Sequence, residues 1–283
     1  MRTRIDLAYD GTDFFGWATQ PDFRTVQGTL ETALATVLRV ERARVVVAGR
    51  TDTGVHARGQ VVHFDVDQEV LEASAGRSAD PPLEAFRRRL NGLLPADLRI
   101  RSVTVAPAGF DARFSAIWRR YAYRVADRPE LVDPLTRRHV LAWRSELDLD
   151  AMNTAAAQLV GLKDFAAFCK KREGATTVRT LKELHWSRDA DGVAVARVVA
   201  DAFCHNMVRS LVGCMLAVGE GRRDPRWALE VMTAGVRDPG VVVVAAHGLT
   251  LEEVGYPAGP ELLAQAERAR AKRELPPLAH ACP

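Results

Sequence analysis

The chain alternates between stretches of strand-like and helix-like hydrophobic spacing. In the first half, short β-branched or alternating apolar runs predict strands at residues 5–9, 44–47, 61–64 and 98–105. Apolar residues at helical spacing predict a helix from Val26 to Leu38 and another that begins at Pro82. Thr25 stands at the N-cap position of the first helix, and proline suits the first turn of the second. The expected order is strand, helix, strand, strand, helix, strand.

The second half repeats this order. We expect strands at residues 117–125, 177–186, 193–199 and 241–245, and helices at residues 149–162, 206–218 and 227–232. Two copies of β-α-β-β-α-β predict an α+β protein made of two ferredoxin-like halves. If the two sheets joined edge to edge, two exposed edges would be covered. The expected fold is therefore a continuous, mainly antiparallel sheet flanked by helices.

Linker-like and charged segments suggest where the parts begin and end. Residues 106–109 read Ala-Pro-Ala-Gly, which favours a boundary between an N-terminal half at 1–107 and a C-terminal half at 108–257. Beyond these lies a tail at 258–283, where a charged helical segment at 261–274 is followed by Leu-Pro-Pro. We assign no chemistry to this tail.

Composition narrows the class of protein. The chain has 283 residues, 47% of them hydrophobic, which is enough for a substantial core, and a net charge of +3. Its basic residues cluster at 87–89, 119–120, 137–138, 170–172 and 222–223. A single cluster is typical of a solvated face, whereas several clusters on one surface would indicate nucleic-acid binding.

Cysteine and histidine spacing argues against a metal site or a disulfide scaffold. The four cysteines form no CxxC pair, and Cys204 and Cys214 stand in apolar surroundings that are typical of buried free thiols. The N-terminus does not resemble a signal peptide, and no apolar run approaches the ~20 residues that span a bilayer. We therefore expect a reduced, cytoplasmic protein with no metal and no membrane contact.

The polar, glycine-rich segment at 48–60 is the first candidate for chemistry, because it connects two predicted strands and contains Asp52. Arg50 precedes this carboxylate by two residues and would favour its ionised, nucleophilic form. An Asx turn is the structural alternative. Asp52-Thr53-Gly54 also matches the aspartic-protease signature, but that chemistry needs two such carboxylates and the chain has no second copy. Only a self-pairing dimer would supply the second.

Two further segments are candidates. Tyr121 and Tyr123 share one face of a predicted strand, and the arginines beside them fit a surface that stacks on bases and binds phosphates. Packing within the core is the alternative for these aromatic residues. Arg209 stands within an apolar helix, where it either reaches solvent or pairs with a carboxylate, for which Asp52 is the obvious candidate.

Together these segments resemble the tRNA pseudouridine synthase A family over residues 3–257. The matching motifs are Tyr9-Asp10-Gly11-Thr12-x-Phe14-x-Gly16-Trp17, Thr25-Val26-Gln27-Gly28, Gly49-Arg50-Thr51-Asp52-x-Gly54-Val55-His56, Phe110-x-Ala112-Arg113-Phe114-Ser115-Ala116, Arg119 or Arg120 with Tyr121-x-Tyr123, Met207-Val208-Arg209-x-x-Val212-Gly213 and Gly248-Leu249-x-Leu251. The chain departs from the commonest pattern at Ala18, at Thr53 and in Cys204-His205-Asn206. None of these departures removes a candidate catalytic group.

The resemblance implies an enzyme that isomerises uridine to pseudouridine at nucleotides 38, 39 and 40 of the tRNA anticodon stem-loop. It implies that Asp52 is the essential carboxylate and that Tyr121 packs against the target base. It further implies that Arg209 pairs with Asp52, that Arg50 holds the flipped nucleotide or fills its place, and that Leu249 lines the uracil pocket. No metal or organic cofactor is expected, and the family works as a homodimer. The alternative is a non-catalytic RNA-binding protein with duplicated ferredoxin-like halves, although the chain lacks the aromatic RNP signature.

Overall fold

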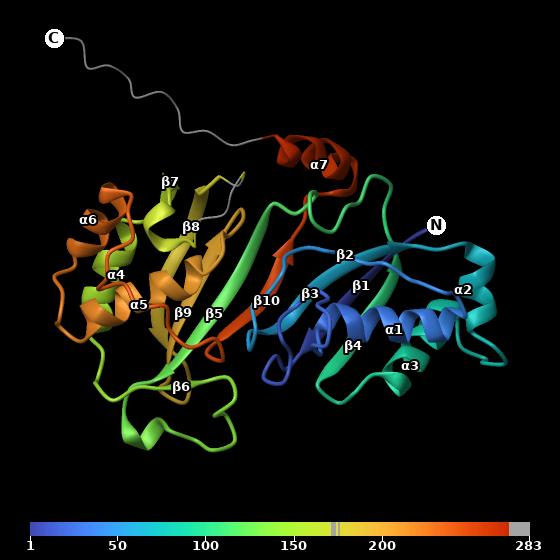
Figure 1. The fold of residues 1–283 in the computed structure, drawn as a ribbon, viewed down its shortest axis with the longest axis horizontal. Helices are drawn as coiled ribbons and strands as arrows, with labels where there is room; N and C mark the ends of the chain where they lie inside the picture. Colours follow the sequence, from blue (N-terminus) through green and yellow to red (C-terminus); the bar gives the residue numbers. More distant parts are fainter. Residues whose placement is uncertain (171–173, 175, 272–283) are drawn as a thin grey trace, which may run out of the picture. The chain divides into compact units, whose positions relative to one another are not determined.

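The computed structural model describes residues 1–170, 174 and 176–271, which divide into two compact units (Figure 1). The first unit consists of Met1–Ala122, Pro134–Leu141 and Ala246–Arg270. The second contains Tyr123–Asp133 and Ala142–Ala245.

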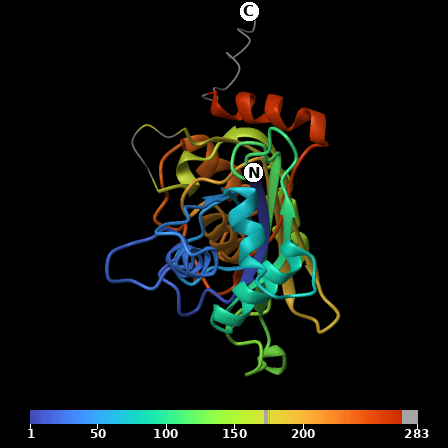
Figure 2. The ribbon, with the colours of Figure 1, turned by 90° about the vertical axis from the view of Figure 1, so that its right-hand side faces the viewer.

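The first unit is a sheet with the strand order β4-β1-β3-β10, and β1 pairs antiparallel with both β3 and β4. The short strand β2 also pairs antiparallel with β3, whereas β10 pairs parallel with it. Figures 1 and 2 show α1 lying against one face of these strands. Its elements are β1 (Arg2–Tyr9), α1 (Val26–Leu38), β2 (Val46–Val47), β3 (His56–Asp65), α2 (Gln68–Ser74), α3 (Pro82–Leu93), β4 (Leu98–Val105), β10 (Leu249–Gly255) and α7 (Leu262–Arg270).

The second unit has the strand order β5-β9-β8-β7, with β8 antiparallel to both of its neighbours. The chain passes from the first unit to the second within β5. The elements are β5 (Trp118–Ala126), β6 (Leu141–Ala142), α4 (Leu149–Ala157), β7 (Gly161–Asp164), β8 (Val178–Arg188), β9 (Ala194–Ala200), α5 (Met207–Gly219) and α6 (Trp227–Ala234). Short 3-10 turns stand at Pro129–Leu131, Ala166–Phe168 and Gly259–Glu261.

The order of the main elements follows β-α-β-β-α-β twice, as β1-α1-β2-β3-α3-β4 and as β5-α4-β8-β9-α5-β10. The expected α+β class, with a mainly antiparallel sheet and flanking helices, is confirmed. Thr25 caps α1 as expected, because its hydroxyl accepts a hydrogen bond of 3.3 Å from the Gly28 N–H. The division into residues 1–107, 108–257 and 258–283 stays a prediction, and residues 272–283 lie outside the described part of the chain.

The predicted closing strand at 241–245 is wrong, and β10 at Leu249–Gly255 closes the second repeat instead. Residues 241–245 pack on α5, where the Arg209 Nε donates to the Val244 carbonyl at 2.6 Å. A Cβ built at Gly213 of α5 would lie 1.9 Å from the Val242 oxygen, so the backbones meet closely at this glycine. The β-branched run at 241–245 therefore packs against helix α5 and does not pair with a strand.

Two further expectations need correction. Helix α4 ends at Ala157 instead of residue 162, because Gly161 takes a left-handed φ of 112° and begins β7. Cys204, expected as a buried thiol, forms a disulfide with Cys169 at a Cα–Cα distance of 5.8 Å. Cys214 is a buried free thiol, as expected, and burial raises its pKa to about 12.

None of the helices in the described residues is long and apolar enough to cross a membrane.

A bidentate ion pair stabilises the second unit. The Arg188 guanidinium donates to both oxygens of Asp127 at 2.7 and 2.8 Å, and the Leu147 N–H donates to the same carboxylate at 2.9 Å. Burial alone would raise the pKa of Asp127, but these hydrogen bonds outweigh it and hold that pKa below its usual value. The pair therefore stabilises the fold only while Asp127 is ionised.

We expect Arg188→Met to lower the free energy of unfolding by about 3 kcal/mol at neutral pH, since it leaves a buried carboxylate unpaired. Because the folded-state pKa of Asp127 is depressed, the contribution is present above the unfolded value of about 3.9 and is lost as pH falls through the folded value. Urea unfolding measured from pH 8 downward should show the difference between variant and wild type shrinking below about pH 4. Arg197→Met is the control, because its pair with Glu183 is exposed and contributes under about 1 kcal/mol. Equal losses in both variants would contradict this assignment.

Candidate active site

The loop between β2 and β3 presents Asp52, and buried polar groups hold its first residues in place. The Gln60 side chain on β3 donates to the Gly49 carbonyl at 2.9 Å and to the Tyr9 hydroxyl at 3.2 Å. The Tyr9 hydroxyl in turn lies 2.7 Å from the Thr51 hydroxyl. Both β1 and β3 therefore fix the backbone immediately before Asp52. The loop is shorter than expected, because β3 already begins at His56.

Residues 10–24 hold the same loop from its other side. The Trp17 N–H donates to the Thr51 carbonyl at 3.0 Å, and the Gly54 N–H donates to the Phe14 carbonyl at 3.4 Å. Gly16 has a left-handed φ of 82°, and a Cβ there would lie 3.1 Å from the Thr51 oxygen, so a glycine suits this contact. The backbone on both sides of Asp52 is thus hydrogen-bonded, while the Asp52 side chain is only half-buried.

Arg119 on β5 provides a third attachment. Its side chain is buried, and its Nη2 donates to the carbonyls of Ala48 and Arg113, each at 2.8 Å. The neighbouring Arg120 points elsewhere and pairs with Glu253 at 2.8 Å. Sequence reasoning left open which of these two arginines belongs to the motif, and the structure places Arg119 at the Asp52 loop. The strand alternation was the available signal, because Arg119 lies two residues before Tyr121 and so shares its face.

Tyr121 lies within the electrostatic reach of both Asp52 and Arg119. Burial raises the pKa of the Tyr121 phenol far above its usual value, Tyr9 and the Asp52 charge raise it further, and the Arg119 charge opposes them. Burial also raises the pKa of Tyr9 to about 12. Both phenols are therefore protonated near neutral pH, and neither can act as a base there.

The remaining expected residues of the first unit differ in exposure. Arg50 is exposed, and its side chain forms no hydrogen bond or ion pair with any described residue. Leu249 is buried at the start of β10. Thr250 is the parallel partner of His56, so Leu249 is level with Val55, three residues after Asp52. Leu249 and the Asp52 loop therefore both lie at the start of β3, and Tyr121 is near enough to Asp52 to feel its charge.

Arg209 belongs to the second unit, where its Nε donates to the Val244 carbonyl. Its expected pairing with Asp52 stays a prediction. The Tyr123 side chain is fully buried and its hydroxyl donates to the Ala245 carbonyl at 2.7 Å. Tyr123 therefore packs within the core, which was the alternative role for the aromatic residues of this strand.

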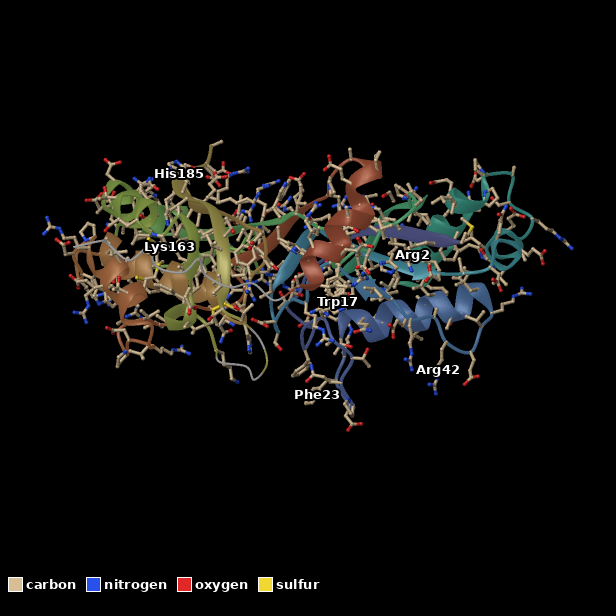
Figure 3. The ribbon with its side chains drawn as sticks, turned by 90° about the horizontal axis from the view of Figure 1, so that it is seen from above. Arg2, Trp17, Phe23, Arg42, Lys163 and His185 are labelled. Carbon is tan, nitrogen blue, oxygen red and sulfur yellow. A yellow bond between two sulfur atoms is a disulfide. The ribbon has the colours of Figure 1, made fainter. Side chains whose placement is uncertain are left out.

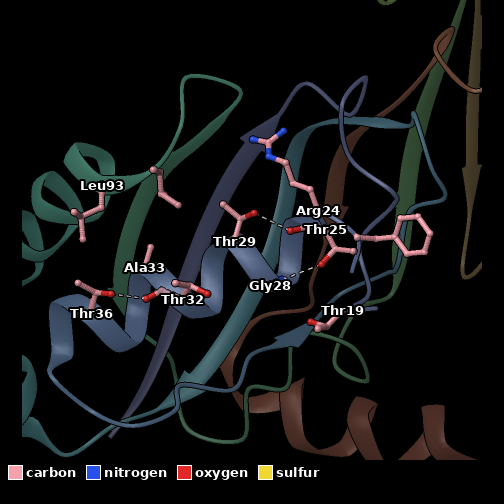
Figure 4. Close-up of a pocket in the computed structure, with 11 residues that line it drawn as sticks. Thr19, Arg24, Thr25, Gly28, Thr29, Thr32, Ala33, Thr36 and Leu93 are labelled. Atoms are coloured by element: carbon pink, nitrogen blue, oxygen red, sulfur yellow. Dashed lines mark hydrogen bonds between the residues drawn. The ribbon is translucent and has the colours of Figure 1, made fainter. Parts of the chain in front are cut away.

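A groove of about 540 Å³ runs along α1 (Figure 4), but its lining contains no acid or base for catalysis. Threonines of α1 contribute much of it, and Thr29 and Thr36 donate their hydroxyls to carbonyls of the helix itself. Its one ionisable side chain, Arg24, pairs with Asp97 at 2.8 Å. Within the described residues, no cluster of three or more His, Cys, Asp or Glu side chains could hold a metal ion.

Comparison with known proteins decides the family. A family model described as tRNA pseudouridine synthase matches residues 7–115 and 155–257. The chain belongs to the tRNA pseudouridine synthase family. It is similar to tRNA pseudouridine synthase A of Streptomyces griseus, with 60% identity over 98% of this chain and 95% of that protein. The protein of the same name from Mycobacterium leprae is 49% identical over 97% of this chain and 95% of its own length.

The expected enzyme class of this tRNA pseudouridine synthase, an isomerase, is thereby confirmed. The matched ranges contain the Asp52 loop, Arg209 and Leu249, whereas Arg119 and Tyr121 fall between them. A chain in the crystal structure of a Cbf5-Nop10-Gar1 complex aligns with 76% of this chain and 54% of that chain, at 10% identity and a TM-score of 0.32, and supports no further conclusion. At the Asp52 loop, the pseudouridine synthase presents a carboxylate, two protonated phenols and a buried guanidinium, which suits nucleophilic or proton-transfer chemistry by one carboxylate.

Proposed function

We propose that this pseudouridine synthase isomerises uridines 38, 39 and 40 of the tRNA anticodon stem-loop, with Asp52 as its catalytic carboxylate. The observation that carries the proposal is the attachment of the Asp52 loop on three sides, by Tyr9, Trp17 and Arg119. Fixing a reacting group in this way removes much of the entropic cost of reaching the transition state. The half-buried Asp52 side chain, close enough to act on Tyr121, supports the assignment.

The reaction moves the ribose from one atom of the base to another. The bond from C1′ to N1 breaks, a bond from C1′ to C5 forms, and the proton lost from C5 is balanced by one gained at N1. Asp52 acts by attacking C1′ of the ribose or C6 of the base, or by taking a proton along a glycal route. All three routes need a carboxylate that is held still beside the nucleotide. Tyr121, protonated and buried, packs against the base in each of them.

The target nucleotide must first leave the stem, at a cost of a few kcal/mol. We assign Arg50 to holding the flipped nucleotide or filling its place, because its exposed guanidinium has no partner among the described residues. Leu249 lines the uracil pocket, and Arg209 pairs with Asp52. Phosphate contacts from exposed basic side chains offset the cost of unstacking and weaken as salt rises. The active form is a cytoplasmic homodimer with one tRNA contacting both subunits.

Incubation with unmodified tRNA, followed by mapping of pseudouridine at each nucleotide, tests this proposal. We expect new pseudouridine at positions 38, 39 and 40. Salt-dependent binding of tRNA without any conversion would instead support the non-catalytic RNA-binding alternative. Conversion only at other nucleotides would support the enzymatic activity but contradict the assignment to positions 38, 39 and 40.

Substitutions of Tyr121 separate its ring from its hydroxyl. We expect Tyr121→Phe to keep kcat/KM within about tenfold of wild type, because the ring that packs against the base remains. Tyr121→Leu keeps a similar apolar volume but loses the aromatic face, and we expect a loss of at least about 100-fold. Single-turnover rates on unmodified tRNA measure both, and unfolding curves check that each variant is folded. If both variants lost the same activity, the hydroxyl rather than the ring would be the important group.

A further inference from the structure

Two phenylalanine rings lie exposed on the loop that precedes α1. Phe15 and Phe23 are 47% and 50% exposed, and they are the only exposed aromatic side chains among the described residues. Their ring centroids lie 4.5 Å apart, so they form one patch, called the Phe15–Phe23 pair below. Figure 3 shows Phe23 on a projecting loop and Trp17 closer to the body of the unit. The two rings thus form a small apolar patch on the surface.

The backbone of the loop fixes the Phe15–Phe23 pair before any partner binds. The Phe15 N–H donates to the Arg24 carbonyl at 2.9 Å, and the Gln20 side chain donates to the Phe15 carbonyl at 2.9 Å. An isolated β-bridge joins Gln20 to Phe23, and Asp22 between them takes a left-handed φ of 62°. A partner that docks on the pair therefore finds the rings already ordered, which lowers the entropic cost of binding.

The same loop is attached directly to the candidate active site. A Cβ built at Gly16, the residue after Phe15, would lie 3.1 Å from the Thr51 oxygen and 3.2 Å from the Thr53 nitrogen, and the Trp17 N–H donates to the Thr51 carbonyl. Consecutive Cα atoms are about 3.8 Å apart, so the Phe15 Cα lies about that far from the Cα of Gly16, which contacts the Asp52 loop. The loop that bears the Phe15–Phe23 pair is therefore the same loop that contacts the backbone on both sides of Asp52.

Charges around the pair favour a neutral, flat partner over a phosphate. Arg24 is paired with Asp97 and lies over the Phe14 ring at 4.0 Å, and the carboxylates of Asp13 and Asp22 stand in the same loop. Asp13 is paired with Arg138 at 3.7 Å, and the loop's one arginine, Arg24, is already paired, so the exposed ring faces are the feature that a partner meets, and they fit the uncharged face of a nucleobase. Stacking on aromatic side chains is the usual way in which proteins hold unpaired bases.

We propose that the Phe15–Phe23 pair is a stacking platform for a nucleobase next to the target uridine, which loses its neighbour when that uridine leaves the helix. This inference rests on the proposed function, since it needs an anticodon stem-loop as the substrate. The platform replaces part of the stacking that flipping removes, and it belongs to the first unit together with Asp52. Its contribution is to binding and positioning of the RNA, and it takes no part in bond making.

Binding of unmodified tRNA to full-length Asp52→Asn protein, with and without a second change at Phe23, tests the platform. We expect Phe23→Leu to weaken binding about tenfold, and Phe23→Trp to restore it, because only the tryptophan keeps an aromatic face. A tRNA with 2-aminopurine next to the target nucleotide should show quenching on the protein with Phe23 or Trp, and little on the Leu variant. Leu135→Ser is the matched control, because Leu135 is an exposed apolar residue of the same unit, and it should leave binding unchanged.

Three outcomes overturn the platform. Equal binding by the Phe23→Leu and Phe23→Trp proteins would show that apolar bulk alone matters. Wild-type binding by Phe23→Leu would show that the pair does not contact RNA. A fall in oligomer mass for Phe23→Leu, measured by light scattering without RNA, would make the pair a contact between two copies of the chain. The proposed function fails separately, if the wild-type protein forms no pseudouridine at positions 38 to 40.

Discussion

Replacing Asp52 by asparagine is expected to abolish pseudouridine formation, with a loss in kcat of at least about 10⁴-fold. The amide has nearly the same shape as the carboxylate, so the loop contacts through Thr51, Gly54 and Val55 should persist. An amide can neither attack carbon nor accept the proton of the glycal route. Binding of unmodified tRNA should stay within about threefold, because phosphate contacts supply most of the affinity. Single-turnover assays and filter binding on the same preparation measure the two effects.

Asp13→Asn is the matched control for this substitution. Asp13 stands in the loop that contacts Thr51, but its side chain is exposed and its pair with Arg138 is long, at 3.7 Å. We expect this variant to turn over tRNA at a rate close to that of wild type. Turnover by Asp52→Asn above about 1% of wild type would remove the carboxylate from the mechanism.

Arg119→Met is expected to have the second-largest effect, on stability and on activity together. The change leaves the Ala48 and Arg113 carbonyls without their buried donor. We expect the free energy of unfolding to fall by about 3 kcal/mol, because each unsatisfied buried group costs about 1–3 kcal/mol. Activity should fall at least about 100-fold at a temperature where the variant is folded, since the Asp52 loop loses one of its three attachments. Urea unfolding and single-turnover kinetics measure the two losses.

Arg120→Met is the control, because Arg120 is the next residue and bears the same charge but pairs with the half-exposed Glu253 at the surface. It should cost under about 1 kcal/mol and leave the rate unchanged. Arg119→Lys adds a second test. An ammonium keeps the charge but cannot reproduce the geometry of a guanidinium, so stability should recover more than activity does. If Arg119→Met and Arg120→Met behaved alike, the buried guanidinium would have no role in holding the loop.

Local sequence predicted most of the helices and strands. Helix α1 and strand β4 begin and end where their apolar spacing indicated, and the Thr25 cap is present. These features depend on residues within one or two turns of each other, so the period of the hydrophobic pattern is enough to define them. The family motifs could likewise be recognised from the sequence, because each motif is a short run of consecutive residues.

Errors arose where a partner distant in sequence decided the structure. Residues 241–245 have the composition of a strand, but Arg209 of α5 binds their backbone. Cys204 stands in surroundings that suit a free thiol, but Cys169, 35 residues earlier, lies within bonding distance. The residue pattern around each segment gave no sign of these partners, since neither interaction repeats at a helical or strand period.

The sequence by itself determined the α+β element order, the family and the identity of Asp52 as the candidate carboxylate. Only the tertiary structure decided what holds Asp52 in place and which arginine of 119 and 120 faces inward. Tyr9, Trp17 and Arg119 reach residues 48–51 from three separate segments, and each contact joins positions that are 34 residues or more apart. Contacts of this kind are selected by the packing of a whole sheet and its buried polar groups, and no local pattern in the chain specifies them.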